Sequence, residues 1–294
     1  RVDSISAALK DALTTTHELC ELVDTPRSLA VSLMLQYHEW AEYLNLSIDP
    51  SAYEDHQHFA DDYLVTEILR KHGDIPLGID RIQTAIDSFK ESEAQCARFN
   101  QLKLTDMPPW FSELQRNVYK LLGPLTSSDL SSIENRFRFG PGASTGVRGK
   151  GSSLSDKYDK PLDLTTGLLP FFRSILGELW WEHHRRAKHR IVEGNRFTTV
   201  PKSAKTDRGI CVEPTLNMYV QLGIGAHLKK RLRRFGLDLE SQERNRHLAQ
   251  RAYDEGLCTI DLSAASDSVS YRLVELLLPP RSFHLLETCR TDFC

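Results

Sequence analysis

The sequence lacks a transmembrane segment and a signal peptide. No apolar run among its 294 residues approaches the roughly 18 residues that a membrane-spanning helix needs. The first residues, Arg1 to Ser6, have neither the basic start nor the apolar stretch of a signal peptide. They also lack a methionine, which leaves open whether the true N-terminus is present. We therefore expect a protein that works without a membrane.

The sequence also lacks the cysteine pattern of a structural metal site. Its six cysteines are scattered, with no C-x-x-C pair and no histidine spacing that is typical of zinc ligands. Scattered thiols are most simply explained by a reducing compartment, which here is the cytoplasm.

Positive charge is scarce outside one stretch. The chain has a net charge of −3, but residues 183–251 hold 16 Lys and Arg against 6 Asp and Glu, so the remaining residues carry a net charge of −13. A basic block in an acidic chain favours binding of a polyanion at one place. A pair of solvated helix faces would explain the same charges. Hydrophobic residues make up 40% and charged residues 26%, the balance of a soluble globular protein large enough for one or two domains.

Residues 1 to about 125 are predicted to be mostly helical, because apolar residues recur there at helical spacing. The three clearest stretches are marked by Leu33, Tyr37, Trp40 and Tyr43, by Leu64, Ile68 and Leu69 within Ala60–His72, and by Ile82, Ile86 and Phe89. Gly73 is expected to stop the second of these helices. We assign the aromatic residues to the core.

Residues 136–160 form a Gly- and Ser-rich segment that carries cations. It does not match a phosphate-binding P-loop, which requires G-x-x-x-x-G-K followed by Ser or Thr. Ser144 stands where the first glycine should be, and Gly151 stands where the hydroxyl residue should be. An ordinary surface loop and a flexible loop near a nucleic acid are the two remaining explanations.

An aromatic-rich helix is predicted over Leu168–Arg186, followed by further basic residues. His183, His184 and His189 have no carboxylate or thiol at a useful spacing for a metal. A basic helix end, stabilised by the helix dipole, is the better interpretation.

The segment Arg196–Pro214 is predicted to be a hairpin, with strands at Phe197–Val200 and Ile210–Val212 and a turn between them. Lys202, Lys205 and Arg208 then project from one hairpin. Lysine acts on phosphate as a point charge and arginine as a bidentate fork, so these cations could hold a triphosphate. A solvated charged hairpin is the structural alternative.

A long helix is predicted over Leu216–Phe235, with apolar residues every four positions and Gly236 as its stop. Its last turns carry five basic residues in six, Lys229-Lys-Arg-Leu-Arg-Arg. That exceeds what capping requires, so contact with a nucleic-acid backbone competes with a purely structural role.

Cys258–Leu262 is predicted to be a buried strand that places Asp261 among apolar neighbours. A carboxylate in such a place is costly to desolvate unless something compensates its charge. A metal ion is one candidate, and a paired buried charge is the other.

Asp267 lies six residues further on, just before a helix predicted over Val269–Leu278 and closed by two prolines. Asp267 is a candidate N-cap of that helix, in competition with Ser266 and Ser268. Capping and a functional role for Asp267 can coexist.

These segments resemble the replicase β subunit of leviviruses, the small positive-strand RNA phages. Asp261-Leu-Ser-Ala-Ala-Ser-Asp-Ser resembles motif A of that family, and Val200-Pro-Lys-Ser-Ala-Lys-Thr-Asp-Arg resembles its motif F. Shorter matches occur at Glu213-Pro, Asn217-Met-Tyr, Gln221-Leu-Gly-Ile-Gly and Leu237-Asp-Leu, and weaker ones at Asp62-Tyr-Leu-Val-Thr and Leu77-Gly-Ile-Asp. The similarity is strong from about 196 to 280 and weak before.

The resemblance implies an RNA-directed RNA polymerase that joins nucleotides by a two-metal mechanism. It implies that Asp261 binds catalytic Mg²⁺, that Asp267 senses the ribose 2′-OH of the incoming nucleotide, and that Lys202, Lys205 and Arg208 line the triphosphate channel. It also implies RNA template and product, nucleoside triphosphates and the host elongation factors Tu and Ts as partners, in the cytoplasm of the bacterial host.

The implied fold is α+β, a right-hand polymerase cut off before the rest of the palm and thumb. We expect a helical region at 1–135, basic fingers at 136–255 and the start of the palm at 256–294. The family also needs a downstream Gly-Asp-Asp turn, which this sequence does not contain. The chain is therefore expected to be a fragment that is inactive alone. A non-catalytic single-stranded RNA-binding protein would explain the basic block but not Asp261, and a P-loop NTPase fails on its missing motif.

Overall fold

The structure is a computed structural model that describes residues 5–149, 152–177 and 189–294. These residues are mostly helical, and the strands among them form two sheets of two strands each, which is compatible with the expected α+β class. The chain divides into two compact units: residues 1–90 with 199–210, and residues 91–198 with 211–294. Among the described residues, no helix combines the length and the apolar character needed to cross a bilayer.

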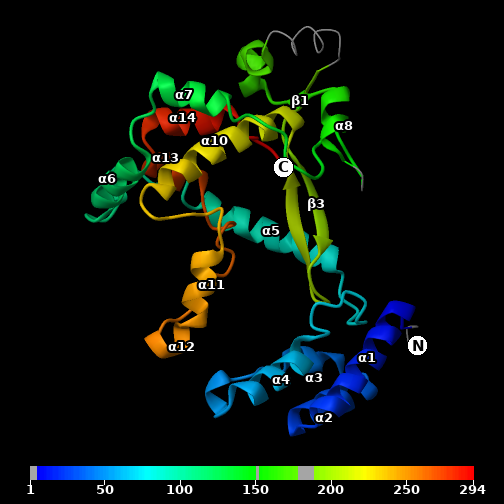
Figure 1. Cartoon of the computed structure of the whole chain (residues 1–294). Coiled ribbons are helices and arrows are strands. Elements are labelled where there is room, and N and C mark those ends of the chain that lie inside the picture. Colours follow the sequence, from blue (N-terminus) through cyan, green and yellow to red (C-terminus); the bar gives the residue numbers. More distant parts are fainter. Residues whose placement is uncertain (1–4, 150–151, 178–188) are drawn as a thin grey trace. The chain divides into compact units, whose positions relative to one another are not determined.

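Unit 1 is built from helices at the N-terminus (Figure 1). They are α1 (Ala7–Val23), α2 (Pro26–Gln36), α3 (Trp40–Asn45), the 3-10 turn η1 (Pro50–Ala52), α4 (His56–Glu67) and the beginning of α5 (Arg81–Ala97). Hydroxyl caps define the first two starts: Ser6 accepts from the amide of Leu9, and Thr25 with Ser28 forms a capping box.

The core of unit 1 is an apolar cluster that includes Leu9, Val31, Leu35, Tyr43 and Val65. The one phenol hydroxyl of this cluster, on Tyr43, is paired. The Tyr43 hydroxyl accepts from the Leu69 amide at 3.0 Å, so this buried oxygen has a hydrogen-bond partner. Burial also raises the pKa of Tyr43 to about 12. Aromatic residues therefore serve the core here, as expected for Tyr43.

Two expectations for unit 1 were wrong in detail. The apolar stripe through Leu33 and Tyr37 does not continue in one helix to Trp40, because His38 adopts a left-handed backbone (φ 59°) between α2 and α3. Trp40 is buried, but Leu33 and Tyr37 are exposed and are not core residues. The helix predicted over Ala60–His72 is α4, which begins at His56 and ends at Glu67, so its stop is not Gly73.

Unit 2 holds the remaining helices and the parallel sheet. The elements are α6 (Phe111–Leu122), α7 (Ser127–Glu134), α8 (Leu154–Asp159), β1 (Asp163–Leu164), η3 (Thr166–Phe171), β2 (Arg190–Ile191), α10 (Thr215–Arg233), α11 (Glu243–Gln250), α12 (Ala252–Glu255), α13 (Tyr271–Leu277) and α14 (Pro280–Thr288), with the short turn η2 (Leu104–Asp106). β1 and β2 are parallel, with Asp163 opposite Arg190 and Leu164 opposite Ile191. The aromatic helix expected over Leu168–Arg186 begins as η3 and continues helically over 172–177, and its later residues, with His183 and His184, lie outside the described residues.

Helix α10 confirms the predicted long helix. Leu216, Val220 and Ile224 are buried in the core of unit 2, at the four-residue spacing read from the sequence. The helix ends as predicted: Gly236 has φ 79°, and the Leu237 amide reaches back to the Leu232 carbonyl at 3.2 Å.

A buried amide on α10 fastens other segments to this helix. The side chain of Asn217 is fully buried; its Oδ1 accepts from the Thr165 amide at 3.0 Å, and its Nδ2 donates to Thr165 Oγ1 at 2.8 Å and to the Cys289 carbonyl at 3.0 Å. One turn later, Gln221 donates to the same carbonyl at 2.9 Å. Thr165, directly before η3, and Cys289, at the end of α14, are thereby tied to α10.

The two compact units do not divide the chain at 135 and 255, where we expect the boundaries of the polymerase subdomains. Those subdomain boundaries remain a prediction. Residues 199–210 join the N-terminal helices, and Ala204 lies in their apolar cluster. Near the C-terminus, Phe293 forms a parallel bridge with Gly194. The two backbones are so close that a Cβ at position 194 would lie 1.9 Å from the Phe293 carbonyl oxygen.

The helix expected over Val269–Leu278 is present as α13, and it begins two residues later than predicted. Its N-cap is Ser270, whose hydroxyl accepts from the Leu273 amide at 3.2 Å. The assignment of the cap to Asp267, Ser266 or Ser268 was wrong, because the helix starts beyond the reach of these side chains.

We predict that Asn217→Ala lowers the free energy of unfolding by roughly 3 kcal/mol, because the buried Thr165 amide and Thr165 Oγ1 lose their partner, although the Cys289 carbonyl still accepts from Gln221. Urea denaturation of the chain measures the change. Asn245→Ala is the matched control, since Asn245 is exposed on α11 and, among the described residues, its side chain hydrogen-bonds only to Gln242. Equal denaturation midpoints for the two variants would contradict the prediction.

Candidate functional site

The predicted hairpin is confirmed as β3 (Arg196–Pro201) and β4 (Asp207–Val212). Its turn is organised by Ser203, whose hydroxyl accepts from the amides of Lys205 and Thr206, each at 3.3 Å. The Ser203 amide in turn donates to the Thr206 carbonyl at 3.0 Å. Ala204 is buried in the core of unit 1, so the turn is anchored at its tip.

The three predicted cations all lie on this hairpin and are exposed. Lys202 directly follows β3 and Arg208 lies in β4; neither has an ion-pair or hydrogen-bond partner among the described residues. Lys205 Nζ donates to Asn45 Oδ1 on α3 at 2.9 Å. The structure therefore presents three cations on one ordered hairpin, and at least two of them are available to bind an anion.

Asp207 is a residue of this hairpin for which the sequence analysis predicts no role. It is buried, and its Oδ1 lies 3.7 Å from Arg81 Nε at the start of α5. Both groups belong to unit 1. Asp207 therefore points into unit 1 while Arg208, its neighbour along the strand, is exposed.

The base of the hairpin is held by polar residues of unit 2. Glu213 accepts from Asn195 at 3.0 Å and from Gln221 at 3.0 Å, and Thr291 lies 3.3 Å from the same carboxylate. Glu213 and Gln221 belong to the stretches that carried the resemblance, but no role was predicted for them. The amide of Gln221 amid the apolar positions of α10, with a carboxylate just before the helix, was the signal that could have indicated a buried network.

The glycine-rich segment is fixed to unit 2 over its first part. Ser144 Oγ lies 2.8 Å from Thr215 Oγ1, and Thr145 Oγ1 donates to Asp163 at 2.5 Å. Lys157 is fully buried and donates to the Gly140 carbonyl at 2.6 Å, and burial lowers its pKa. The described part of this segment is therefore an anchored loop that leads into α8, and its Arg148 is exposed to solvent.

The basic end of α10 is only partly available for a ligand. Arg231 donates to the Leu122 carbonyl, and Arg233 pairs with Asp238 at 3.1 Å and with Glu240. Lys229 and Lys230 are exposed and have no such partners in the described part of the chain. The structural interpretation therefore holds for Arg231 and Arg233, and contact of Lys229 and Lys230 with a nucleic-acid backbone stays a prediction.

The segment that holds Asp261 differs from the prediction. Residues 257–262 form no strand, and Ile260 and Leu262 are 77% and 68% exposed. Asp261 is exposed rather than buried, because no strand of the described chain pairs with this segment and shields it. Asp267 is exposed as well; its carbonyl accepts from Cys96 Sγ at 3.3 Å.

The described residues do not assemble a metal site. No group of three or more His, Cys, Asp or Glu side chains with metal-binding geometry occurs among them. Two exposed carboxylates six residues apart do not suffice for Mg²⁺, which is held in a near-octahedral shell of oxygen ligands. The predicted metal role of Asp261 therefore has no support from this geometry.

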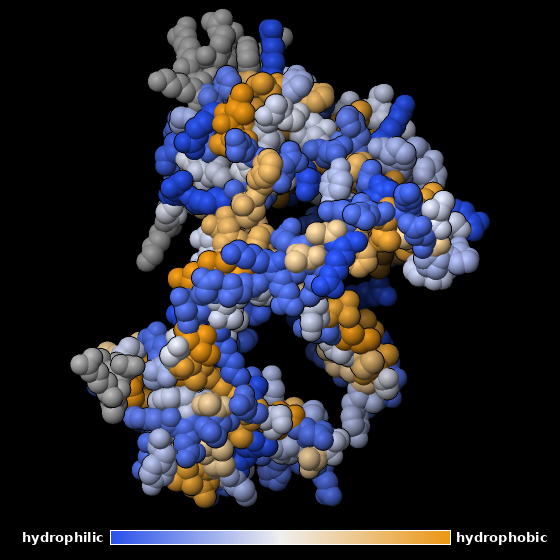
Figure 2. All heavy atoms as spheres, turned by 180° about the vertical axis from the view of Figure 1, so that it is seen from behind, coloured by the Kyte–Doolittle hydropathy of each residue, from blue (hydrophilic) through white to orange (hydrophobic). Residues whose placement is uncertain are grey.

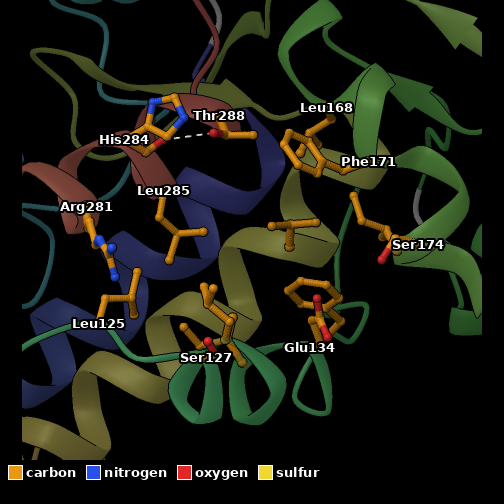
Figure 3. Close-up of a pocket in the computed structure, with 15 residues that line it drawn as sticks. Leu125, Ser127, Glu134, Leu168, Phe171, Ser174, Arg281, His284, Leu285 and Thr288 are labelled. Carbon is orange, nitrogen blue, oxygen red and sulfur yellow. Dashed lines mark hydrogen bonds between the residues drawn. The ribbon is translucent and has the colours of Figure 1, made fainter.

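A cavity of about 370 Å³ opens in unit 2 between α7, η3, α10 and α14 (Figure 3). Its walls are mainly apolar, with Leu125, Leu168, Phe171 and Leu285 among the residues around it. Arg281 is the one cation among its lining residues. This chemistry does not suit a triphosphate, and the cations of the hairpin do not line it.

Comparison with known proteins identifies the family. Residues 7–294 match the family model described as RNA replicase, beta-chain. The chain is 36% identical over 253 residues to the RNA-directed RNA polymerase subunit beta of Enterobacteria phage SP, covering 80% of this chain and 42% of that protein. It is 34% identical over 290 residues to the RNA-directed RNA polymerase beta chain of Escherichia phage MS2, covering 94% and 52%.

A third relative, the RNA-directed RNA polymerase subunit beta of Escherichia virus Qbeta, is 34% identical over 306 residues, covering 98% of this chain and 50% of its own. The chain thus spans about half the length of the curated relatives it matches. The matched proteins are polymerase subunits of RNA phages, and this chain belongs to the RNA replicase beta-chain family. The resemblance inferred from the motifs is confirmed.

Proposed function

We propose that this chain forms part of an RNA-directed RNA polymerase that copies a phage RNA genome from ribonucleoside triphosphates. The observation that carries the proposal is the anchored hairpin of Lys202, Lys205 and Arg208, in a chain whose relatives are named RNA-directed RNA polymerases. A solvated hairpin would need neither a buried tip nor an organised turn.

The hairpin suits the departure of pyrophosphate. In nucleotidyl transfer the 3′-OH of the growing RNA attacks the α-phosphorus of the nucleotide, the bond to the bridging oxygen of the β-phosphate breaks, and pyrophosphate leaves as an anion. Lysines near the phosphates act as point charges, and Arg208 can form two parallel hydrogen bonds to phosphate oxygens. Negative charge grows on the leaving group in the transition state, so these cations accelerate the reaction as well as bind substrate.

The proposed roles of Asp261 and Asp267 require further residues, beyond the half of the relatives' length that this chain matches. We assign Asp261 to Mg²⁺ and Asp267 to the ribose 2′-OH, with further carboxylates and neighbouring strands supplied by the remaining length that the relatives have. The exposed Ile260 and Leu262 beside Asp261 support this, because a segment with such side chains gains free energy when strands cover it. Elongation factors Tu and Ts as partners, and the host cytoplasm as the location, are part of the same proposal.

We predict that Arg208→Ala raises the KM for nucleotides and lowers kcat in a polymerase that contains this chain and the remaining length of its relatives. The contact serves both the bound triphosphate and the leaving pyrophosphate. Steady-state incorporation at varied nucleotide concentration measures both constants. Arg246→Ala, an exposed arginine on α11, is the matched control. Unchanged nucleotide dependence with weaker template binding would reassign Arg208 to the RNA backbone.

In the same polymerase, Asp261→Asn is expected to abolish nucleotide incorporation while template affinity stays within about twofold. The loss of one metal-binding charge costs several kcal/mol of transition-state stabilisation, whereas the basic residues that hold RNA are unchanged. Primer extension and filter binding measure the two effects, with Asp254→Asn as the control for an exposed aspartate. Incorporation within a few-fold of the parent would remove the metal role.

The chain by itself is expected to bind single-stranded RNA weakly and to incorporate no nucleotide. Exposed cations such as Lys229 and Lys230 release counterions, so the affinity should fall with salt at a log–log slope of about −0.7 per phosphate contacted. Fluorescence anisotropy across a salt series and labelled-nucleotide incorporation test this on one sample. Salt-insensitive binding would refute the electrostatic part, and polymerisation would show that the active site is misplaced. RNA binding that persists without any activity in the longer polymerase would favour the non-catalytic alternative.

A further inference from the structure

Helix α2 is apolar on two opposite sides, and only one side is covered. Val31 and Leu35 are buried in the core of unit 1. Leu29 and Leu33, one turn apart on the other side, are 61% and 43% exposed, and Tyr37 at the end of the helix is 70% exposed. A helix with apolar residues all round normally has neighbours on every side. Figure 2 shows scattered apolar patches on an otherwise largely hydrophilic surface, seen from behind the view of Figure 1.

The helices that pack with α2 in unit 1 are strongly acidic. Residues 7–67, which form α1 to α4, contain 12 Asp and Glu but only two Lys and Arg, a net charge of −10. Some of these carboxylates are used inside the unit, as Asp62 is by Thr25 at 2.5 Å and Tyr53 at 2.8 Å. Others are exposed without an ion-pair partner in the described chain, including Glu18 and Glu21 on α1.

This combination of features restricts what can cover α2. RNA and anionic lipid headgroups are repelled by a surface of the same sign, and both are polyanionic where they meet a protein. A cationic protein segment gains from the acidic surroundings, and if it is an amphipathic helix its apolar side can bury Leu29 and Leu33. We propose that the exposed face of α2 docks a cationic amphipathic helix of a protein partner. The proposal is independent of the polymerase function.

The hairpin cations do not alter this conclusion. Lys202, Lys205 and Arg208 belong to the same unit, but they lie on the turn that contacts α3 through Asn45. They add three positive charges against ten net negative charges on α1 to α4. Unit 1 therefore carries a small cationic site for phosphate and a separate acidic, apolar surface for protein.

The test uses the whole chain and a fluorescein-labelled 18-residue peptide of leucine and lysine, arranged as an amphipathic helix. The double variant Leu29→Ser/Leu33→Ser should weaken peptide binding at least about tenfold, because two leucine side chains are no longer buried on binding. Leu104→Ser/Leu154→Ser is the matched control, since those leucines are 55% and 53% exposed in unit 2, and should change the affinity less than about twofold.

A second variant tests the charge and does not touch the apolar face. Glu18→Gln/Glu21→Gln should also weaken the peptide and flatten the salt dependence of its binding. A peptide with glutamate in place of lysine should not bind. Thermal unfolding of each variant checks that unit 1 is intact, and if the leucine double variant is unfolded, the glutamine variant decides.

Three results would overturn the proposal. The first is that the peptide binds the parent chain, the leucine double variant and the glutamine double variant with equal affinity. The second is concentration-dependent dimerisation in sedimentation velocity that the leucine variant abolishes, because a second copy would then be the occupant. The third is binding of RNA or phosphatidylglycerol vesicles that is lost in the leucine variant but not in its control.

Discussion

The amide of Asn217 is the interaction on which the arrangement of unit 2 depends. It is buried on α10 and hydrogen-bonds to Thr165 and to the end of α14 at Cys289. Burying an amide is costly unless its donors and acceptor are used, so this residue tolerates only an arrangement in which both partners are in place. Gln221 and Glu213 extend the same network to Asn195 at the start of the hairpin. The apolar residues of α10 supply the burial, and the amides select which segments meet there.

The hairpin is therefore held at both ends by different means. Its base is held by carboxylate and amide hydrogen bonds in unit 2, and its tip by Ala204 in an apolar core and by Asp207 near Arg81 in unit 1. The backbone that carries these cations is already ordered, so an anion that binds them has to order only their side chains. A rigid support of this kind is what transition-state stabilisation by fixed charges requires.

Much of this architecture could be predicted from the sequence, and the misses have a common physical cause. Helix α10, the β3–β4 hairpin and α13 have local signals: apolar periodicity, turn residues and a glycine or proline stop. The break at His38 and the cap at Ser270 depend on one backbone angle and on one helical register, which periodicity does not resolve. The predicted strand at 258–262 failed because a strand also needs a neighbour, and sequence pattern reports propensity without reporting pairing. The residue pattern offered a triphosphate role for Lys202, Lys205 and Arg208 and a metal as one candidate for Asp261, and motif resemblance made these roles specific and added that of Asp267; the family match supports the resemblance at the level of the chain.

The contribution of residues 199–210 to unit 1 has a consequence for the order of events during synthesis. The N-terminal helices leave the ribosome first, but their apolar cluster is completed by Ala204, which lies more than 100 residues after Lys90. At roughly 5–20 residues per second, translation of the intervening chain takes on the order of ten seconds. During that interval α1 to α4 are present without the hairpin tip, and the nascent chain carries an open apolar site that only its own later sequence can close. The fold of unit 1 can therefore be completed only after much of unit 2 has been synthesised, although unit 1 comes first in the sequence.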